Sequence, residues 1–168
     1  FEKTGELTEL NEPGPVIGED NLKALLEKLE GYAKEDTLFV LAGSVPQGVE
    51  KDIYKRIIEM VHKKGAKVLL DADGELFTQA LAAGPDIIKP NRVELEQYAG
   101  MDYVASEQEL LLIAKKLMES GIESVVVSMG KSGAMFLRPD LQVHCPGLRV
   151  KAHSTVGAGA VSYTHLRA

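Results

Sequence analysis

The stretch TLFVLAGSVPQGVEKDIYKRIIEMVHKKGAKVLLD, residues 37–71, contains the alternation that decides the fold. It opens on the apolar run 37–42, continues through a loop into a helical pattern over 51–64, and ends on the apolar run 67–71. Short continuous apolar runs are typical of buried parallel strands, and a helix between two of them makes a right-handed crossover. The stretch therefore predicts a β–α–β unit.

The same alternation extends in both directions from this unit. In the helix over 51–64, the residues expected to face the core are Ile53, Ile57, Met60 and Val61. In an earlier helix over 19–34, they are Leu22, Leu25, Leu26 and Leu29. Further helices are expected over 75–83, 91–99 and 106–120, strands over 86–88 and 123–128, and a hairpin of 133–137 with 141–145. We predict the α/β class, with a mostly parallel sheet and helices on both faces.

Composition indicates an acidic globular domain. The 168 residues include 19 Lys and Arg against 25 Asp and Glu, which gives a net charge of −6 and no basic surface for nucleic acid. No apolar run approaches the about 18 residues that span a bilayer. The single cysteine, Cys145, excludes an internal disulfide and a cysteine zinc cluster. We expect a soluble, cytoplasmic protein that binds neither nucleic acid nor membranes.

The loops that follow the predicted parallel strands are the candidate sites, because ligands bind outside the carboxyl ends of such strands. The loop after residue 42 carries the hydroxyl of Ser44, which fits either a plain turn or a contact with substrate. Asp71 and Asp73 follow the next strand and could bind an ion, although an Asp at a strand end more often caps a helix.

Asn91 and Glu94 stand three residues apart at the start of a predicted helix. One interpretation is structural, because Asn at the N-cap and Glu three residues later form a capping box. The other is functional, because an amide and a carboxylate beside a helix N-terminus can hold Mg²⁺ and its waters next to a phosphate. The local pattern leaves both interpretations open.

Two glycine-rich segments could let the backbone approach an anion. The loop Ser128–Gly133 contains Gly-Lys-Ser, but Val125 stands where a Walker A loop needs glycine, so the loop is either a turn or a nucleotide contact of another kind. In Ser154–Gly159, small residues leave backbone N–H groups bare. Placed before a helix, these groups would form a concavity for a developing negative charge.

The order of these motifs is more specific than any one of them. It resembles the PfkB branch of the ribokinase-like carbohydrate kinases, from Thr8 to Gly159, in LAGSVPQG (41–48), DADGE (71–75), IKPNRVELE (88–96), VVVSMGKSG (125–133) and STVGAG (154–159). Within this family the resemblance is strongest to the 1-phosphofructokinase group, followed by tagatose-6-phosphate kinases.

The resemblance implies a ribokinase-like α/β/α sandwich with a small β-sheet lid. It also implies transfer of the γ-phosphoryl group of ATP to a sugar phosphate, assisted by Mg²⁺. The expected reaction converts fructose 1-phosphate to fructose 1,6-bisphosphate, with tagatose 6-phosphate or fructose 6-phosphate as alternative acceptors. A parent homodimer is implied too, because lids in this family often pair between subunits.

The resemblance also implies roles for residues at the matching positions. Asn91 and Glu94 fall on the family's N-x-x-E element for the metal–phosphate region, and Ser44 falls on a substrate contact. The positions assigned to nucleotide binding are Lys89, Asn91, Ser128, Gly130 and Gly133. Those assigned to the anion hole are Gly157, Ala158 and Gly159.

One departure from the family pattern matters most. The fourth residue of the family's G-A-G-D motif is the Asp that acts as general base, and this chain has Ala160 there. Without a proton acceptor for the sugar hydroxyl, we expect a loss of rate of about 10²–10⁴-fold, so the chain as written should be inactive. The alternative is a catalytically dead protein that senses nucleotide or sugar phosphate. An NAD-binding domain is disfavoured, because the early glycine fingerprint is missing.

Both ends of the chain look cut. The first residue is Phe1, and the last eight residues, VSYTHLRA, match a translated sequencing adapter whose junction would turn an Asp codon into Ala160. We expect residues 1–160 to be part of a kinase domain, with 1–12 a strand remnant that joins lid to core, and 161–168 to be a non-native tail. Much of the N-terminal lid portion and the C-terminal part of the domain would then be missing.

Overall fold

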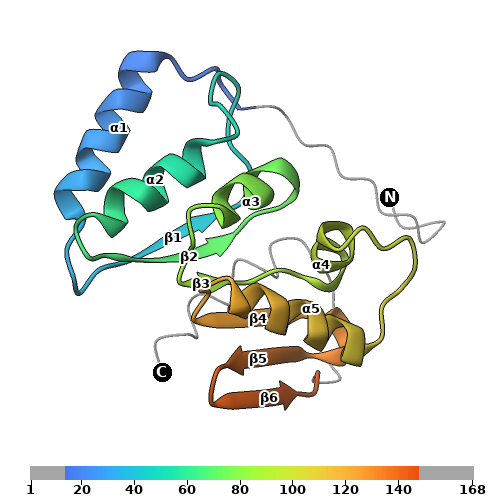
Figure 1. The fold of residues 1–168 in the computed structure, drawn as a ribbon. Helices are drawn as coiled ribbons and strands as arrows, with labels where there is room; N and C mark the ends of the chain where they lie inside the picture. The colour runs from blue at the N-terminus through green and yellow to red at the C-terminus, as the bar shows by residue number, and fades with distance from the viewer. Residues whose placement is uncertain (1–13, 148–168) are drawn as a thin grey trace.

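The computed structural model describes residues 14–147, which form a single sheet with helices packed against it (Figure 1). In chain order the elements are α1 (Glu19–Tyr32), β1 (Leu38–Ala42), α2 (Ile53–His62), β2 (Lys67–Asp71), α3 (Gly74–Leu81), β3 (Ile87–Ile88), α4 (Arg92–Tyr98), α5 (Glu107–Glu119), β4 (Ser124–Ser128), a short 3-10 helix (Gly130–Ser132), β5 (Ala134–Arg138) and β6 (Leu141–Cys145). Every predicted element within this range is present, with bounds that differ by at most two residues.

The sheet has the strand order β1-β2-β3-β4-β5-β6. Strands β1 to β4 are parallel neighbours, and β5 and β6 form an antiparallel hairpin at one edge. The mostly parallel α/β sheet and the hairpin are therefore confirmed. Because β1 to β4 are parallel neighbours, their carboxyl ends lie together along one end of the sheet, which we call the carboxyl edge.

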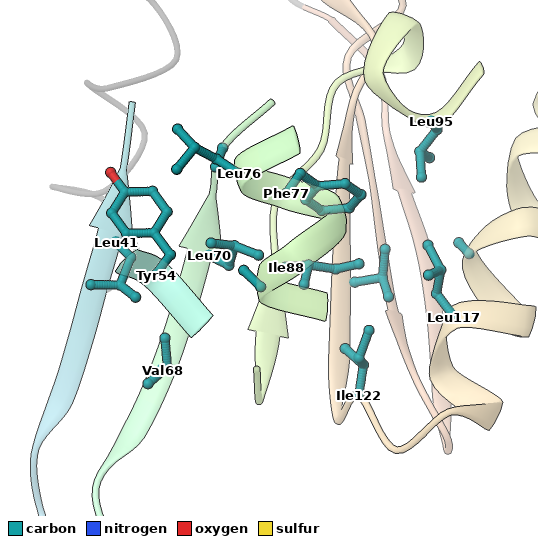
Figure 2. Packing of buried hydrophobic residues seen from close by; sticks show 14 of the residues in the cluster. Leu41, Tyr54, Val68, Leu70, Leu76, Phe77, Ile88, Leu95, Leu117 and Ile122 are labelled. Carbon is teal, nitrogen blue, oxygen red and sulfur yellow. The ribbon is translucent and has the colours of Figure 1, made fainter. Parts of the chain in front are cut away.

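The five described α-helices share one face of this sheet. Every second residue of the strands, such as Leu41, Leu70 and Val125, belongs to one buried cluster with the inner faces of α2, α3, α4 and α5. Figure 2 shows this layer of side chains between the strands and the helices. Helices on the second face, which the sequence also predicts, are not found among residues 14–147.

Some predicted inward positions differ in the structure. Helix α1 contacts α2 at the outside of the helical layer. Leu25 is 48% exposed there, whereas Leu22, Leu26 and Leu29 contact the core. In α2 the buried residues include Ile58 and Tyr54, which the pattern did not single out, whereas Met60 is half-buried. Val40 alternates with Leu41 and so points to the second face of β1, at an edge of the described sheet, where it is 46% exposed despite its apolar run.

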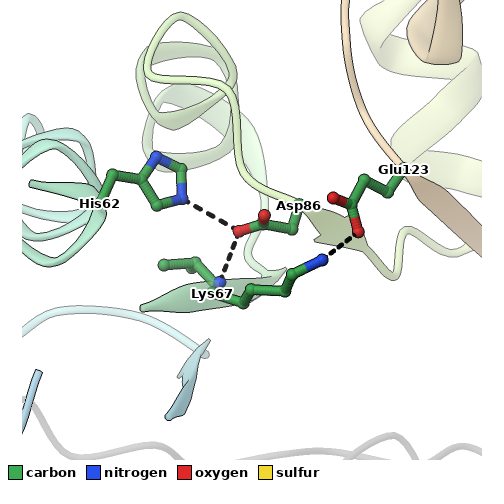
Figure 3. A network of polar contacts seen from close by, with 5 residues as sticks. His62, Lys67, Asp86 and Glu123 are labelled. Carbon is green, nitrogen blue, oxygen red and sulfur yellow. Dashed lines mark hydrogen bonds and ion pairs between the residues drawn. The ribbon is translucent and has the colours of Figure 1, made fainter. Parts of the chain in front are cut away.

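A polar network ties the amino ends of the strands together (Figure 3). The Asp86 carboxylate accepts a hydrogen bond from the backbone N–H of Val68 at 2.7 Å and lies 2.9 Å from Nε2 of His62. Nearby, Lys67 and Glu123 form an exposed ion pair. This network lies at the edge of the sheet opposite to the four loops, so His62 serves the structure there and not the candidate site.

None of the helices in residues 14–147 combines the length and the hydropathy that crossing a membrane requires.

Candidate functional site

Three of the predicted loops line one pocket at the carboxyl edge of the sheet. Its walls are formed by residues 42–44 after β1, residues 71–73 after β2, and Glu94 on α4. The parallel register brings these segments together, because Ala42 pairs with Asp71. Strand β3 lies next to β2, and a short connection over residues 89–91 leads from it to α4. Ser44, Asp71 and Glu94, which come from three separate segments, therefore line one pocket.

A second pocket lies between the end of α5 and the turn of the β5–β6 hairpin. The register of β4 with β5 pairs Val125 with Leu137, which puts this pocket at the amino edge of the sheet, away from the loops. No motif of the sequence falls in it. We therefore place the candidate site in the pocket at the carboxyl edge.

A largely buried ion pair adjoins the candidate pocket through Asp71, which lines it. Nζ of Lys89 lies 2.9 Å from Oδ2 of Asp71, and the side chains are only 6% and 20% exposed. Leu70 of β2 pairs with Ile88 of β3, so Asp71 and Lys89, which follow them in the chain, lie side by side. The N–H of Lys89 donates to the carbonyl of Leu70 at 2.9 Å. A buried ammonium needs a partner of opposite charge. The sheet thus holds one cation fixed behind the loops.

Asn91 and Glu94 form the capping box that the structural interpretation predicts. Oδ1 of Asn91 accepts from the N–H of Glu94 at 2.9 Å, and Oε2 of Glu94 accepts from the N–H of Asn91 at 2.8 Å. Nδ2 of Asn91 also donates to Oε1 of Glu94 at 2.6 Å. The cap does not exclude the functional interpretation, because it holds the Glu94 carboxylate rigidly at the pocket wall.

The charge of Glu94 is disfavoured by its surroundings. Burial raises the pKa of this carboxyl, and the negative charges of Asp71 and Asp73 raise it further. The hydrogen bond from Asn91 and the charge of Lys89 act in the opposite direction. A cation that entered the pocket would relieve this repulsion. The three carboxyl groups therefore make the pocket receptive to positive charge.

The loop after β4 joins the same edge. Ser128 forms a bridge with Asn91, and its N–H donates to the carbonyl of Pro90 at 3.0 Å. Gly130 has φ +56°, and a Cβ atom there would meet nothing within 4 Å. The loop is thus next to the capping box and open at Gly130, as a nucleotide contact would require.

A backbone contact that the sequence did not reveal explains why position 133 is a glycine. At φ +94°, a Cβ atom would lie 2.0 Å from the carbonyl oxygen of Cys145 and 2.5 Å from the nitrogen of Gly147. The end of the hairpin therefore passes directly over this turn. Close packing of two backbones accounts for the glycine without a nucleotide.

We expect Gly133→Ala to destabilise the chain by about 2 kcal/mol or more, because both the positive φ and the backbone contact oppose a side chain. Gly130→Ala is the matched control, since it has a positive φ but open space, and should cost about 1–2 kcal/mol. Urea unfolding of the three proteins measures both values. Equal losses for the two variants would show that the hairpin does not press on Gly133.

The remaining assigned positions, Gly157, Ala158, Gly159 and Ala160, lie outside the described residues. Within residues 14–147, no group of three or more His, Cys, Asp and Glu side chains has the geometry of a metal site. The sequence analysis named Asp71 as an ion ligand or cap but missed its ion pair with Lys89. It did not consider Tyr54, whose hydroxyl donates to the carbonyl of Ala42 at the edge of the pocket.

Comparison with known proteins agrees with this arrangement. The pfkB family carbohydrate kinase profile matches residues 6–159. This chain belongs to the pfkB family of carbohydrate kinases. The 1-phosphofructokinase of Bacillus subtilis (strain 168) is 36% identical over 157 residues, which are 94% of this chain and 51% of that protein. The D-tagatose-1-phosphate kinase of Bacillus licheniformis is 31% identical over 146 residues, 87% of this chain and 48% of that protein.

Solved structures of this kinase fold match as well. Phosphofructokinase-2 from Escherichia coli, crystallised with fructose-6-phosphate, superposes with a TM-score of 0.86 and 27% identity, covering 98% of this chain and 54% of that one. Ribokinase of Arabidopsis thaliana shares the fold, with a TM-score of 0.61 and 21% identity over 88% of this chain and 44% of that one. The chain spans about half the length of the relatives it matches. The ribokinase-like fold and the kinase family are thus established, and ATP is the phosphoryl donor that a kinase family implies.

Proposed function

We propose that this chain is the core part of a kinase that transfers the γ-phosphoryl group of ATP to fructose 1-phosphate and forms fructose 1,6-bisphosphate. The observation that carries the proposal is the meeting of the motif loops at one edge, where Lys89 pairs with Asp71 in the wall of the pocket that Ser44 and Glu94 also line. The relatives named 1-phosphofructokinase support the choice of substrate. Tagatose phosphates and fructose 6-phosphate are the alternative acceptors.

Each described residue has a task that follows from its place. The ammonium of Lys89 offsets negative charge on the phosphates, and its buried setting keeps it at one position. The N–H groups beside the open Gly130 give the nucleotide a close approach. Ser44 offers a hydroxyl to the sugar at the opposite wall of the pocket. These residues position the two substrates for direct transfer.

The pocket fits Mg²⁺ by the chemistry of its oxygen donors. Both carboxylate oxygens of Glu94 and Oδ1 of Asn91 already accept hydrogen bonds, which favours contact through the waters that Mg²⁺ retains. Glu94, with Asp71 and Asp73 near it, would hold the ion in this way. When bound, the ion would neutralise charge on the phosphates.

Three further parts of the proposal concern the whole protein. Residues 1–160 are part of the kinase domain and 161–168 a non-native tail, which is supported by the end of the family match at Gly159. The parent kinase forms a homodimer through its lid. Asp stands at position 160 in the parent, so this chain by itself is inactive.

A chimera tests the proposed activity. The matching half of the Bacillus subtilis 1-phosphofructokinase is replaced by residues 1–160 of this chain with Asp at position 160, and ADP release is followed with fructose 1-phosphate, fructose 6-phosphate and tagatose 6-phosphate. We expect fructose 1-phosphate to give the highest kcat/KM. A folded chimera that releases ADP with none of the three sugars would refute the proposal.

A catalytically dead sensor is the second candidate, and Ala160 is the observation that favours it. The two candidates differ in how much phosphoryl transfer an Asp at this position restores.

A further inference from the structure

Tyr54 of α2 reaches the exact point where β1 ends and the Ser44 loop begins. Its hydroxyl donates to the carbonyl of Ala42 at 3.0 Å and to the carbonyl of Gly43 at 3.2 Å. Only 8% of the residue is exposed, and its ring stands beside Leu41 in the core layer (Figure 2). One phenolic proton is thus shared between two consecutive carbonyl groups of the loop.

The backbone is shaped to meet this hydroxyl. In an extended strand consecutive carbonyl groups point to opposite sides, whereas here both reach the same atom. The reason is Gly43, whose φ of +81° turns the chain, although a Cβ atom there would meet nothing within 4 Å. The glycine is therefore required by conformation and not by lack of space.

Gly43 is held from its other side as well. Its N–H donates to the carbonyl of Asp71 at 2.9 Å. The peptide groups around Gly43 are thus fixed by β2 through the N–H and by α2 through the carbonyl. Ser44 is the next residue, and it lines the pocket with Asp71 and Glu94.

We propose that Tyr54 is a positioning residue, whose hydroxyl fixes the Ala42–Gly43 backbone so that Ser44 faces the sugar phosphate. The part that concerns the sugar rests on the proposed function; the part that concerns the loop does not. Tyr54 touches no reacting atom in this arrangement. It acts through the backbone of the loop, and it links the buried core of α2 to the wall of the pocket.

The loop part is tested on the 168-residue chain itself, by NMR hydrogen exchange of the Gly43 amide. Tyr54→Phe keeps the ring and removes the donor, so we expect this amide to exchange about 3–10-fold faster, as loss of one neutral hydrogen bond allows. Amides in the middle of β2 should exchange as before. Tyr103→Phe is the matched control, because it removes an exposed hydroxyl bond to Glu109, away from the pocket.

A merely structural role predicts a different pattern. If Tyr54→Phe only weakened the whole fold, the amides of β2 would accelerate together with that of Gly43, and this result would overturn the proposal. Unchanged exchange at Gly43 would overturn it too. 4-Aminophenylalanine at position 54 keeps a donor at the same place and should restore slow exchange. It also keeps the test available if Tyr54→Phe does not fold.

The sugar part is tested in the active chimera. Tyr54→Phe should raise KM for the sugar phosphate by about 3–10-fold, with KM for ATP unchanged and kcat within about twofold. A fall in the maximal rate with unchanged KM would indicate fewer folded molecules and overturn the positioning role. An unmodified chimera that releases no ADP would instead defeat the proposed function, while the exchange experiment would still decide the role of Tyr54 in the loop.

Discussion

Turnover of the chimera with Asp at position 160 is expected to exceed that of the chimera with Ala160 by about 10²–10⁴-fold. The sugar hydroxyl must lose its proton as the phosphoryl group arrives, and an alanine cannot accept it. KM for ATP should change little, because the described nucleotide loop is the same in both proteins. Steady-state ADP release at saturating fructose 1-phosphate measures the ratio.

The control for this experiment is Asn at position 160, which has the shape of Asp but no basic carboxylate. It should remain as slow as the alanine form if proton acceptance is the missing function. A dead sensor predicts another outcome. In that case the Asp form would gain less than about tenfold, while calorimetry would still show nucleotide or sugar phosphate binding to the alanine form.

The sheet was predictable from the sequence because its strands and helices differ in period and length. The apolar runs ending at Ala42, Asp71 and Ser128 and the helical faces between them predict parallel β–α–β units, since crossovers are right-handed, but they do not predict that the described helices share one face. The exposure of single side chains was less predictable. Leu25 has helical spacing, but whether it reaches the core depends on how α1 lies on the other helices, which no local pattern encodes.

The candidate site was predictable at the level of loops and not of contacts. Parallel strands must end at a common edge, so the approach of Ser44 to Glu94 follows from the topology. The partner of Lys89 depends on the register of β2 with β3, and Tyr54 depends on the tilt of α2 against β1. Both are tertiary facts. At Gly133 the sequence correctly marked a position that needs glycine, but the close contact with the end of the hairpin accounts for it.

Replacing Lys89 by Met is expected to destabilise the chain by about 3–5 kcal/mol, the cost of removing one member of a buried ion pair. Met keeps most of the apolar stem, so lost packing contributes little. Lys67→Met is the matched control. That lysine is 52% exposed and pairs with Glu123 at the opposite edge of the sheet, and an exposed pair is worth about 1 kcal/mol or less. Urea unfolding of the 168-residue chain measures both variants.

A double variant, Lys89→Met with Asp71→Asn, separates the effect of the ion pair on stability from the effect of the lysine on turnover. Removing both charges should recover much of the stability, because a buried pair replaced as a whole is often nearly neutral. Turnover of the same double variant in the chimera should stay low, because no ammonium then stands behind the phosphates. Equal stability losses for Lys89→Met and Lys67→Met would contradict the buried pair. Recovered turnover in the double variant would mean that Lys89 serves the fold alone, and the cation that holds the phosphates must then come from another part of the kinase.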